Sequence, residues 1–220
     1  MDELAHGLLR ALCFDTSWGY APTRIELMTH WDGGVSGSPP ASSSLSSLDE
    51  AFHGLVAQGA IQEWRGRVVF PGNEALVTEH ETREELFPRK LRKARRVAAW
   101  LRRLEGVRFV ALCNTTAQAH ARDTGDLDFF VITRPGAIWQ TRAWASLPFK
   151  LFGDRPSEQN EKQDAVCLSF FVDEVALDLS SLFLSNDDPY FRHWFLSLLP
   201  LYNEGMMESL WEANAKIHQQ

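Results

Sequence analysis

The sequence predicts a mixed α/β protein in which a small mixed sheet flanked by helices follows a helical N-terminal domain. Apolar residues recur at helical spacing in the first 60 residues, and residues 107–182 alternate β-rich runs with helix-compatible segments. The chain has 220 residues, of which 45% are hydrophobic and 23% charged. This composition is typical of a globular protein of one or two domains and excludes a fibrous or wholly disordered chain.

Residues 1–80 predict three helices followed by a β-hairpin. Leucines at helical spacing begin the first helix, Thr23 and Glu26 form a capping box for the second, and Ser47 can cap the third. A stretch rich in Gly, Ser and Pro, residues 33–47, predicts a loop between the second and third helices.

The hairpin is expected to join strands 60–64 and 68–71 through Arg65-Gly66-Arg67. Three helices and a hairpin form the order of a winged helix, and LDEAFHGLVAQGAIQEWRGRVVFPG resembles the third helix and wing of such domains. DNA-reading helices use Arg, Lys, Asn or Gln. The polar residues expected on the third helix are acidic or neutral, namely Asp49, Glu50, His53 and Gln58. We therefore expect this domain to contact protein or to serve packing rather than to read DNA sequence.

Residues 81–105 predict a basic linker helix, which Pro88 is expected to break into two pieces. Nine basic and two acidic residues lie between Arg83 and Arg103, although the whole chain carries a formal net charge of −7. Two interpretations stay open. The helix either presents a solvated face that pairs with an acidic body, or it attracts a polyanion.

Strand and helix signals alternate in the second half of the chain. Strands are expected at 107–113 and 126–133, and helices at 115–121 and 138–151. One or two further strands are expected within 166–179. The last 35 residues predict two helices separated near Pro200.

The chemistry of the chain is concentrated in VALCNTTAQAHARDTGDLDFFVIT, residues 110–133. Asp126 and Asp128 are two apart on an expected strand, so their carboxylates share one face. Two such carboxylates repel each other unless a cation lies between them, and Mg²⁺ prefers one or two carboxylates together with substrate phosphates. Asn114 and Thr115 begin a short helix after the preceding strand, where backbone N–H groups favour a phosphate. This pattern is typical of phosphoryl or nucleotidyl transfer.

These residues resemble the nucleotidyltransferase domain of the DNA polymerase beta superfamily, whose pattern is h-G-[GS] followed by D-h-[DE]-h. Asn114-Thr115 takes the G-S position, and Asp126-Leu127-Asp128-Phe129 matches the second half at the right distance. The wording CNTTAQAHARDTGDLDFFVITRPGAIWQTR is similar to a bacterial subgroup with an N-[ST] pair and a preceding winged-helix-like region. The resemblance implies a winged-helix-like domain at 1–80, a nucleotidyltransferase-like domain at 106–185 and C-terminal helices at 186–220.

The resemblance also implies a third carboxylate on a neighbouring strand, for which Asp178 is the candidate, with Asp173 and Glu174 as rivals that can instead form a turn. Catalysis and metal binding, by Mg²⁺ or Mn²⁺, would then use Asp126, Asp128 and Asp178. The nucleotide would contact residues from the short helix and nearby arginines, namely Asn114, Thr115, Thr116, Arg122, Arg134 and Arg142. Asn114 replaces a glycine, and Asn tolerates the left-handed backbone region better than most residues. For Arg134 and Arg142, a salt bridge with an acidic group is an equal alternative, and Arg122 can instead stay solvated.

The implied activity is transfer of a nucleoside monophosphate from a nucleoside triphosphate such as ATP to a hydroxyl of a protein, an RNA or a small molecule. One alternative is a nucleotidyltransferase fold without catalysis that binds nucleotides or proteins, with the N-terminal domain as a protein-docking module. A second alternative is a nucleic-acid-binding regulator that uses the winged helix. Three isolated cysteines and the lack of a signal peptide or apolar span predict a cytoplasmic protein with no membrane partner.

Overall fold

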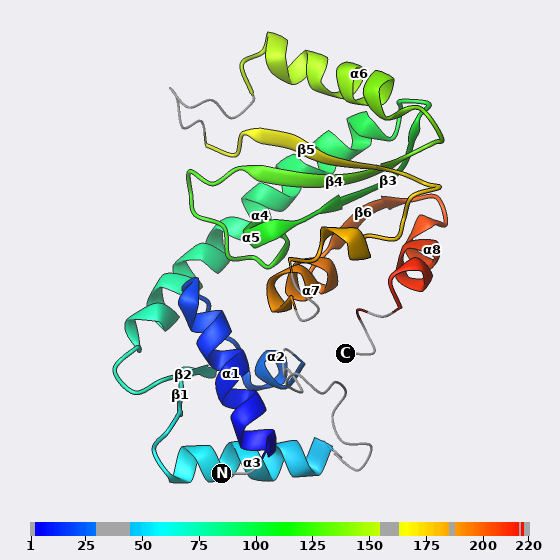
Figure 1. Ribbon diagram of the computed structural model, residues 1–220. Coiled ribbons are helices and arrows are strands. Elements are labelled where there is room, and N and C mark those ends of the chain that lie inside the picture. Colours follow the sequence, from blue (N-terminus) through cyan, green and yellow to red (C-terminus); the bar gives the residue numbers. More distant parts are fainter. Residues whose placement is uncertain (1–2, 30–44, 155–162, 185–187, 216, 218–220) are drawn as a thin grey trace. The chain divides into compact units, whose positions relative to one another are not determined.

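The computed structural model describes residues 3–29, 45–154, 163–184, 188–215 and 217 (Figure 1). It is a mixed α/β protein, as the sequence predicts. The chain divides into two compact units, residues 1–82 with 218–220, and residues 83–217. Residues 33–44 of the expected loop lie outside the described residues. Its last three residues, 45–47, belong to a helix.

The first unit contains three helices and a hairpin in the predicted order: α1 (Glu3–Ser17), α2 (Arg24–Thr29), α3 (Leu45–Ala57), β1 (Gln62–Trp64) and β2 (Arg67–Val69). The three helices and the hairpin share a core that includes Leu8, Leu12, Leu27, Phe52, Leu55 and Val68. The capping box is confirmed: the Thr23 N–H donates to Glu26 Oε2 at 2.7 Å, and the Glu26 N–H donates to Thr23 Oγ1 at 3.2 Å. The hairpin turn uses positive φ at Arg65 (52°) and Gly66 (79°), as a tight two-residue connection between twisted strands requires.

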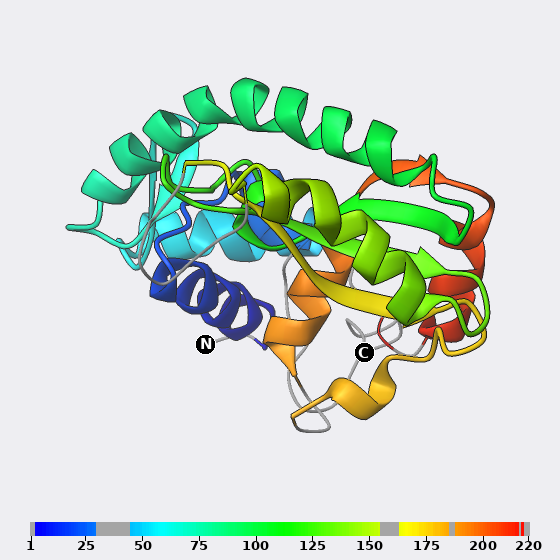
Figure 2. The ribbon, with the colours of Figure 1, turned by 90° about the horizontal axis from the view of Figure 1, so that it is seen from above.

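Helix α4 (Ala75–Leu101) runs from the first unit into the second without interruption (Figure 2). The expected break at Pro88 is therefore wrong, and the helix starts six residues before the predicted residue 81. Proline removes one N–H from the helical ladder, but the packing of Ala94, Val97 and Leu101 on the sheet outweighs this loss.

The second unit is built on four strands in the order β5-β4-β3-β6. They are β3 (Val107–Leu112), β4 (Leu127–Thr133), β5 (Val166–Asp173) and β6 (Leu199–Asn203). The pairs β3–β4 and β3–β6 are antiparallel, and β4–β5 is parallel. The parallel pair is connected through α6 (Ile138–Leu151), whose bounds are those predicted. The region 166–179 holds one strand rather than two.

Strand β6 was not expected, because Pro200 and its apolar neighbours predict a break between helices. Pro200 lies opposite Ala111 on the edge strand of the sheet, at a register shift. An edge strand tolerates a proline since one side of its backbone needs no ladder hydrogen bond. Two short helices flank this strand, α7 (Pro189–Leu196) and α8 (Met206–Ala213).

Helices cover both faces of the sheet. Side chains of α4 and α6 pack with Leu127, Phe129 and Val131, the odd-numbered residues of β4. Side chains of α7 and α8 pack with Phe130 and Ile132, the even-numbered residues. This alternation places Asp128 with the face that α7 and α8 cover, and Asp126 immediately precedes the strand.

Candidate functional site

The end of β3 and the start of β4 meet because these strands are antiparallel. The Cys113 N–H donates to the carbonyl oxygen of Asp128 at 3.0 Å. The short helix α5 (Asn114–Ala117) follows at once, so Asn114 and Thr115 lie beside the aspartate pair. Asn114 has a φ of 57°, in the left-handed region. A position that favours glycine is thus occupied by one of the residue types that best tolerates that backbone.

Thr116 ties α5 to the aspartate segment. Its fully buried hydroxyl donates to the carbonyl oxygen of Asp126 at 2.9 Å. Thr116, one of the residues expected at the nucleotide, therefore uses its hydroxyl to hold the site together. Asn114 and Thr115 are half-buried. After α5, the amide of Gln118 lies 2.6 Å from Nε2 of His193, which connects this loop to α7.

The two aspartates are both half-buried. Asp126 immediately precedes β4, and Asp128 is its second residue. The Asp128 carboxylate has no hydrogen bond or ion pair with any residue that the structure describes. Its charge is felt by a neighbour: burial raises the pKa of the Cys113 thiol, and the negative charge of Asp128 raises it further. Cys113 is therefore an inert thiol beside an uncompensated carboxylate.

A divalent cation fits part of the predicted ligand set. Asp126 and Asp128 are two residues apart and can supply the one or two carboxylates that Mg²⁺ uses together with phosphates. Within the described ranges, no three His, Cys, Asp or Glu side chains are grouped so that they could hold a metal ion.

The structure does not bring Asp178 to this pair. Asp178 is exposed on the loop that follows β5, where its carboxylate accepts the Ser180 N–H at 2.9 Å. Because β4 and β5 are parallel and Asp128 pairs with Cys167, the aspartates lie at the start of these strands and the loop leaves from their end. The rival residues, Asp173 and Glu174, lie where β5 ends in a turn, which is the alternative that the sequence left open. Asp173 accepts the N–H groups of Gly136 and Val175.

The three arginines expected at the nucleotide are distributed over the unit. Arg122 is exposed in the loop before Asp126, close to the pair in sequence. Arg134 follows the last residue of β4 and pairs with Glu105 at 2.9 Å, and six residues of strand put it about 20 Å from Asp128. Arg142 lies on α6 with its guanidinium 5.9 Å from the Phe171 ring centroid, on the opposite face of the sheet. Arg134 thus follows the salt-bridge alternative, and the structure does not group Arg142 with the aspartates.

Sequence reasoning missed the residue that holds the loop before the aspartates. Lys90 is 1% exposed, and its ammonium donates to the carbonyl oxygen of Gly125 at 2.7 Å, to that of Asp123 at 3.3 Å and to Asp164 Oδ1 at 2.6 Å. The signal was present in the sequence. Lys90 continues the buried stripe of α4 that includes Ala94 and Leu101, so a charge at that position requires a buried partner.

Other cations of α4 also pair with the body of the second unit. Arg89 donates to both carboxylate oxygens of Asp164 and pairs with Asp123 at 2.7 Å. Hydrogen bonds from Arg89 and from Gln163 lower the pKa of Asp123. Lys93 pairs with Asp154 at 3.0 Å. The interpretation of a helix that pairs with an acidic body is confirmed for Arg89, Lys90 and Lys93.

Both positive residues of the hairpin are partnered within the first unit. Arg65 pairs with Glu81 at 3.0 Å, and Arg67 is buried and donates to the carbonyl oxygen of Ala21 at 2.6 Å. On α3, Asp49 pairs with Arg24 of α2. Both arginines of the hairpin are therefore used in contacts that stabilise the unit.

Comparison of the chain with protein-family models, with curated proteins and with solved structures finds no match. Among the helices described, none combines the length and the apolar character needed to span a lipid bilayer.

Proposed function

We propose that the Asp126–Asp128 site binds a nucleoside triphosphate together with a divalent cation and transfers the nucleoside monophosphate to a hydroxyl. The observation that carries this proposal is the half-buried Asp128 carboxylate, which lacks a hydrogen bond or ion pair with the described residues and lies two positions after the half-buried Asp126. Leaving a partly desolvated negative charge uncompensated costs free energy, and a bound cation removes that cost.

In this proposal, Asp126 and Asp128 hold the cation, and the Asn114 amide and Thr115 hydroxyl contact the phosphates from the start of α5. Mg²⁺ or Mn²⁺ at this position would neutralise charge on the triphosphate and lower the pKa of the acceptor hydroxyl. The acceptor oxygen forms a bond to the α-phosphorus, the bond to the pyrophosphate oxygen breaks, and pyrophosphate leaves with that electron pair. The acceptor proton passes to water.

A second candidate function is nucleotide binding without transfer. The position of Asp178 favours it, because the residue expected to assist the acceptor lies on a loop beyond the far end of β5. A site with two carboxylates retains the cation and the phosphates but lacks a third group near the acceptor.

Calorimetric titration with ATP, GTP, CTP and UTP, with and without Mg²⁺, tests the site. We expect binding that depends on Mg²⁺ and that Asp128→Asn weakens by at least about tenfold, since one charge-assisted contact contributes 1.5–3 kcal/mol. Asp178→Asn is the matched control: it makes the same chemical change on an exposed residue, and we expect affinity within about twofold of the wild type. If no triphosphate binds, or if Asp128→Asn binds as well as the wild type, the proposal is wrong.

Release of pyrophosphate then separates the two candidate functions. Wild-type protein, ATP and Mg²⁺ are incubated with pools of protein, RNA and small-molecule acceptors. Release that requires Asp128 supports transfer, whereas tight binding without release in every pool supports the binding module.

A further inference from the structure

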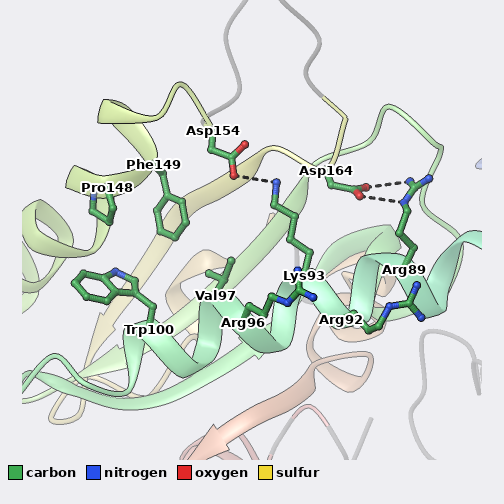
Figure 3. A pocket seen from close by; sticks show the side chains of 10 residues that line it. All are labelled: Arg89, Arg92, Lys93, Arg96, Val97, Trp100, Pro148, Phe149, Asp154 and Asp164. Carbon is green, nitrogen blue, oxygen red and sulfur yellow. Dashed lines mark hydrogen bonds and ion pairs between the residues drawn. The ribbon is translucent and has the colours of Figure 1, made fainter.

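A second site is suggested by an open cavity of about 510 Å³ beside α4 (Figure 3). Helix α4 contributes the basic residues Arg89, Arg92, Lys93 and Arg96, and the apolar end is formed by Trp100, Pro148 and Phe149. Small-molecule sites occupy about 300–1,000 Å³ and combine apolar walls with a few polar groups. The cavity has a volume in this range, with apolar side chains at one end and charged side chains at the other.

Among the described residues that line the cavity, positive charges outnumber negative ones. Arg89 is neutralised by Asp164 and Lys93 by Asp154, and Figure 3 shows both contacts. Arg92 and Arg96 are exposed and form no hydrogen bond or ion pair with the described residues. They are four residues apart on a helix, where like charges destabilise each other by a few tenths of a kcal/mol. The lining therefore carries two uncompensated positive charges, which an anion would neutralise.

The apolar end of the cavity is aromatic. Figure 3 shows Trp100 and Phe149 at the same end of the cavity, with Pro148 beside them. Aromatic and apolar side chains of this kind pack well against a planar ring.

This cavity is separate from the aspartate pair. Val97 of α4 lines it and packs on the face of the sheet to which Leu127 and Phe129 of β4 point. Asp128 belongs to the opposite face by the alternation of the strand.

We propose that this cavity binds a small aromatic phosphate of the nucleoside monophosphate class. Arg92 and Arg96 bind the phosphate, because guanidinium groups donate paired N–H hydrogen bonds that match its oxygens. The base packs against Phe149 and Trp100. Arg96 and Trp100 are one helical turn apart, about 6 Å along the axis, which suits a ligand whose phosphate and ring are close together.

Calorimetry with AMP tests this site in EDTA, so that the cation-dependent site makes no contribution. We expect the Arg92→Gln/Arg96→Gln variant to lose at least about tenfold in affinity, because each charge-assisted hydrogen bond contributes 1.5–3 kcal/mol. The matched control is Arg95→Gln/Arg103→Gln, which removes the same charge. Arg95 lines a different groove, beside Leu199, and neither residue lines this cavity. The control should bind within about twofold of the wild type because only long-range electrostatics change.

Two further probes separate the ring from the phosphate. Adenosine lacks the phosphate and inorganic phosphate lacks the ring, and each should bind at least about tenfold more weakly than AMP.

Four results would overturn the proposal. AMP does not bind; the control variant loses as much affinity as Arg92→Gln/Arg96→Gln; inorganic phosphate binds as well as AMP; or Asp128→Asn abolishes AMP binding in EDTA. The last result would assign the ligand to the aspartate site. Because AMP binding in EDTA and triphosphate binding in Mg²⁺ are measured separately, either proposal can fail without the other.

Discussion

The two faces of the four-stranded sheet hold charge in opposite ways. On the face covered by α7 and α8, Asp128 presents a half-buried carboxylate without a cation among the described residues. On the face covered by α4 and α6, the described cations outnumber their partners, and Arg92 and Arg96 have no anion among the described residues. A charge that the fold pairs stabilises the fold, whereas an unpaired charge in a partly enclosed place is available to a ligand.

Two residues of helix α4 that are two positions apart show the same difference between a paired and an unpaired cation. Lys90 is buried and holds the loop that leads to Asp126, and Arg92 is exposed and lines a cavity. Both residues are part of one basic run in the sequence. Their different roles come from the helical rotation of about 200° between positions i and i+2, which turns one toward the sheet and the other away from it.

The largest effect is expected at the buried cation. Lys90→Met leaves Asp164 with only Arg89 and leaves the carbonyl groups of Asp123 and Gly125 without their donor, so we expect the free energy of unfolding to fall by about 3 kcal/mol. Urea unfolding followed by tryptophan fluorescence measures it. Arg92→Met, the matched change at an exposed position, should stay within about 0.5 kcal/mol of the wild type. A loss below about 1 kcal/mol for Lys90→Met would mean that paired and unpaired cations of α4 do not differ as we state.

An intermediate effect is expected on the acidic face. Thr116→Val keeps the shape of the side chain but removes the hydroxyl that donates to the Asp126 carbonyl oxygen, so we expect a loss of about 1–2 kcal/mol in the free energy of unfolding. Thr124→Val is the control, since Thr124 is exposed in the same loop. The same urea unfolding measurement applies. Equal stabilities of the two variants would show that this hydrogen bond does not hold α5 against the aspartates.

The smallest effect is a change in one titration. Arg89 lowers the pKa of Asp123, so Arg89→Gln should raise that pKa toward its ordinary value of 3.8, while Arg92→Gln should leave it unchanged. Since the folded pKa lies below the unfolded one, this interaction stabilises the protein above pH 3.8, and the stabilisation is lost as the pH falls through the folded pKa. NMR titration of the Asp123 carboxyl carbon measures both variants. If the pKa of Asp123 is the same in Arg89→Gln as in the wild type, the ion pair with Arg89 does not lower that pKa.

Local patterns predicted most of the elements. The helix at 138–151 has its predicted bounds, the capping box at Thr23 and Glu26 forms, and strands occur where β-rich runs occur. These features depend on neighbours within four or five residues, which the sequence displays directly.

Predictions that needed distant partners were less accurate. Helix α4 continues through Pro88 because the sheet packs against the residues after it, and the sequence around Pro200 becomes a strand because β3 offers an edge to pair with. Neither partner is visible in the local sequence. In both cases tertiary contacts outweigh the local preference of proline.

The sequence by itself determined that Asp128 takes one face of its strand while Leu127 and Phe129 take the other, because side chains alternate along any strand. Only the tertiary structure decided which other residues accompany them. The parallel pairing of β4 and β5 sends Asp178 beyond the far end of the strands, the length of β4 separates Arg134 from the aspartates, and the packing of α4 gives Lys90 a buried partner while leaving Arg92 and Arg96 to the cavity. Alternation is a property of the backbone, whereas these placements depend on which elements of a long chain come together.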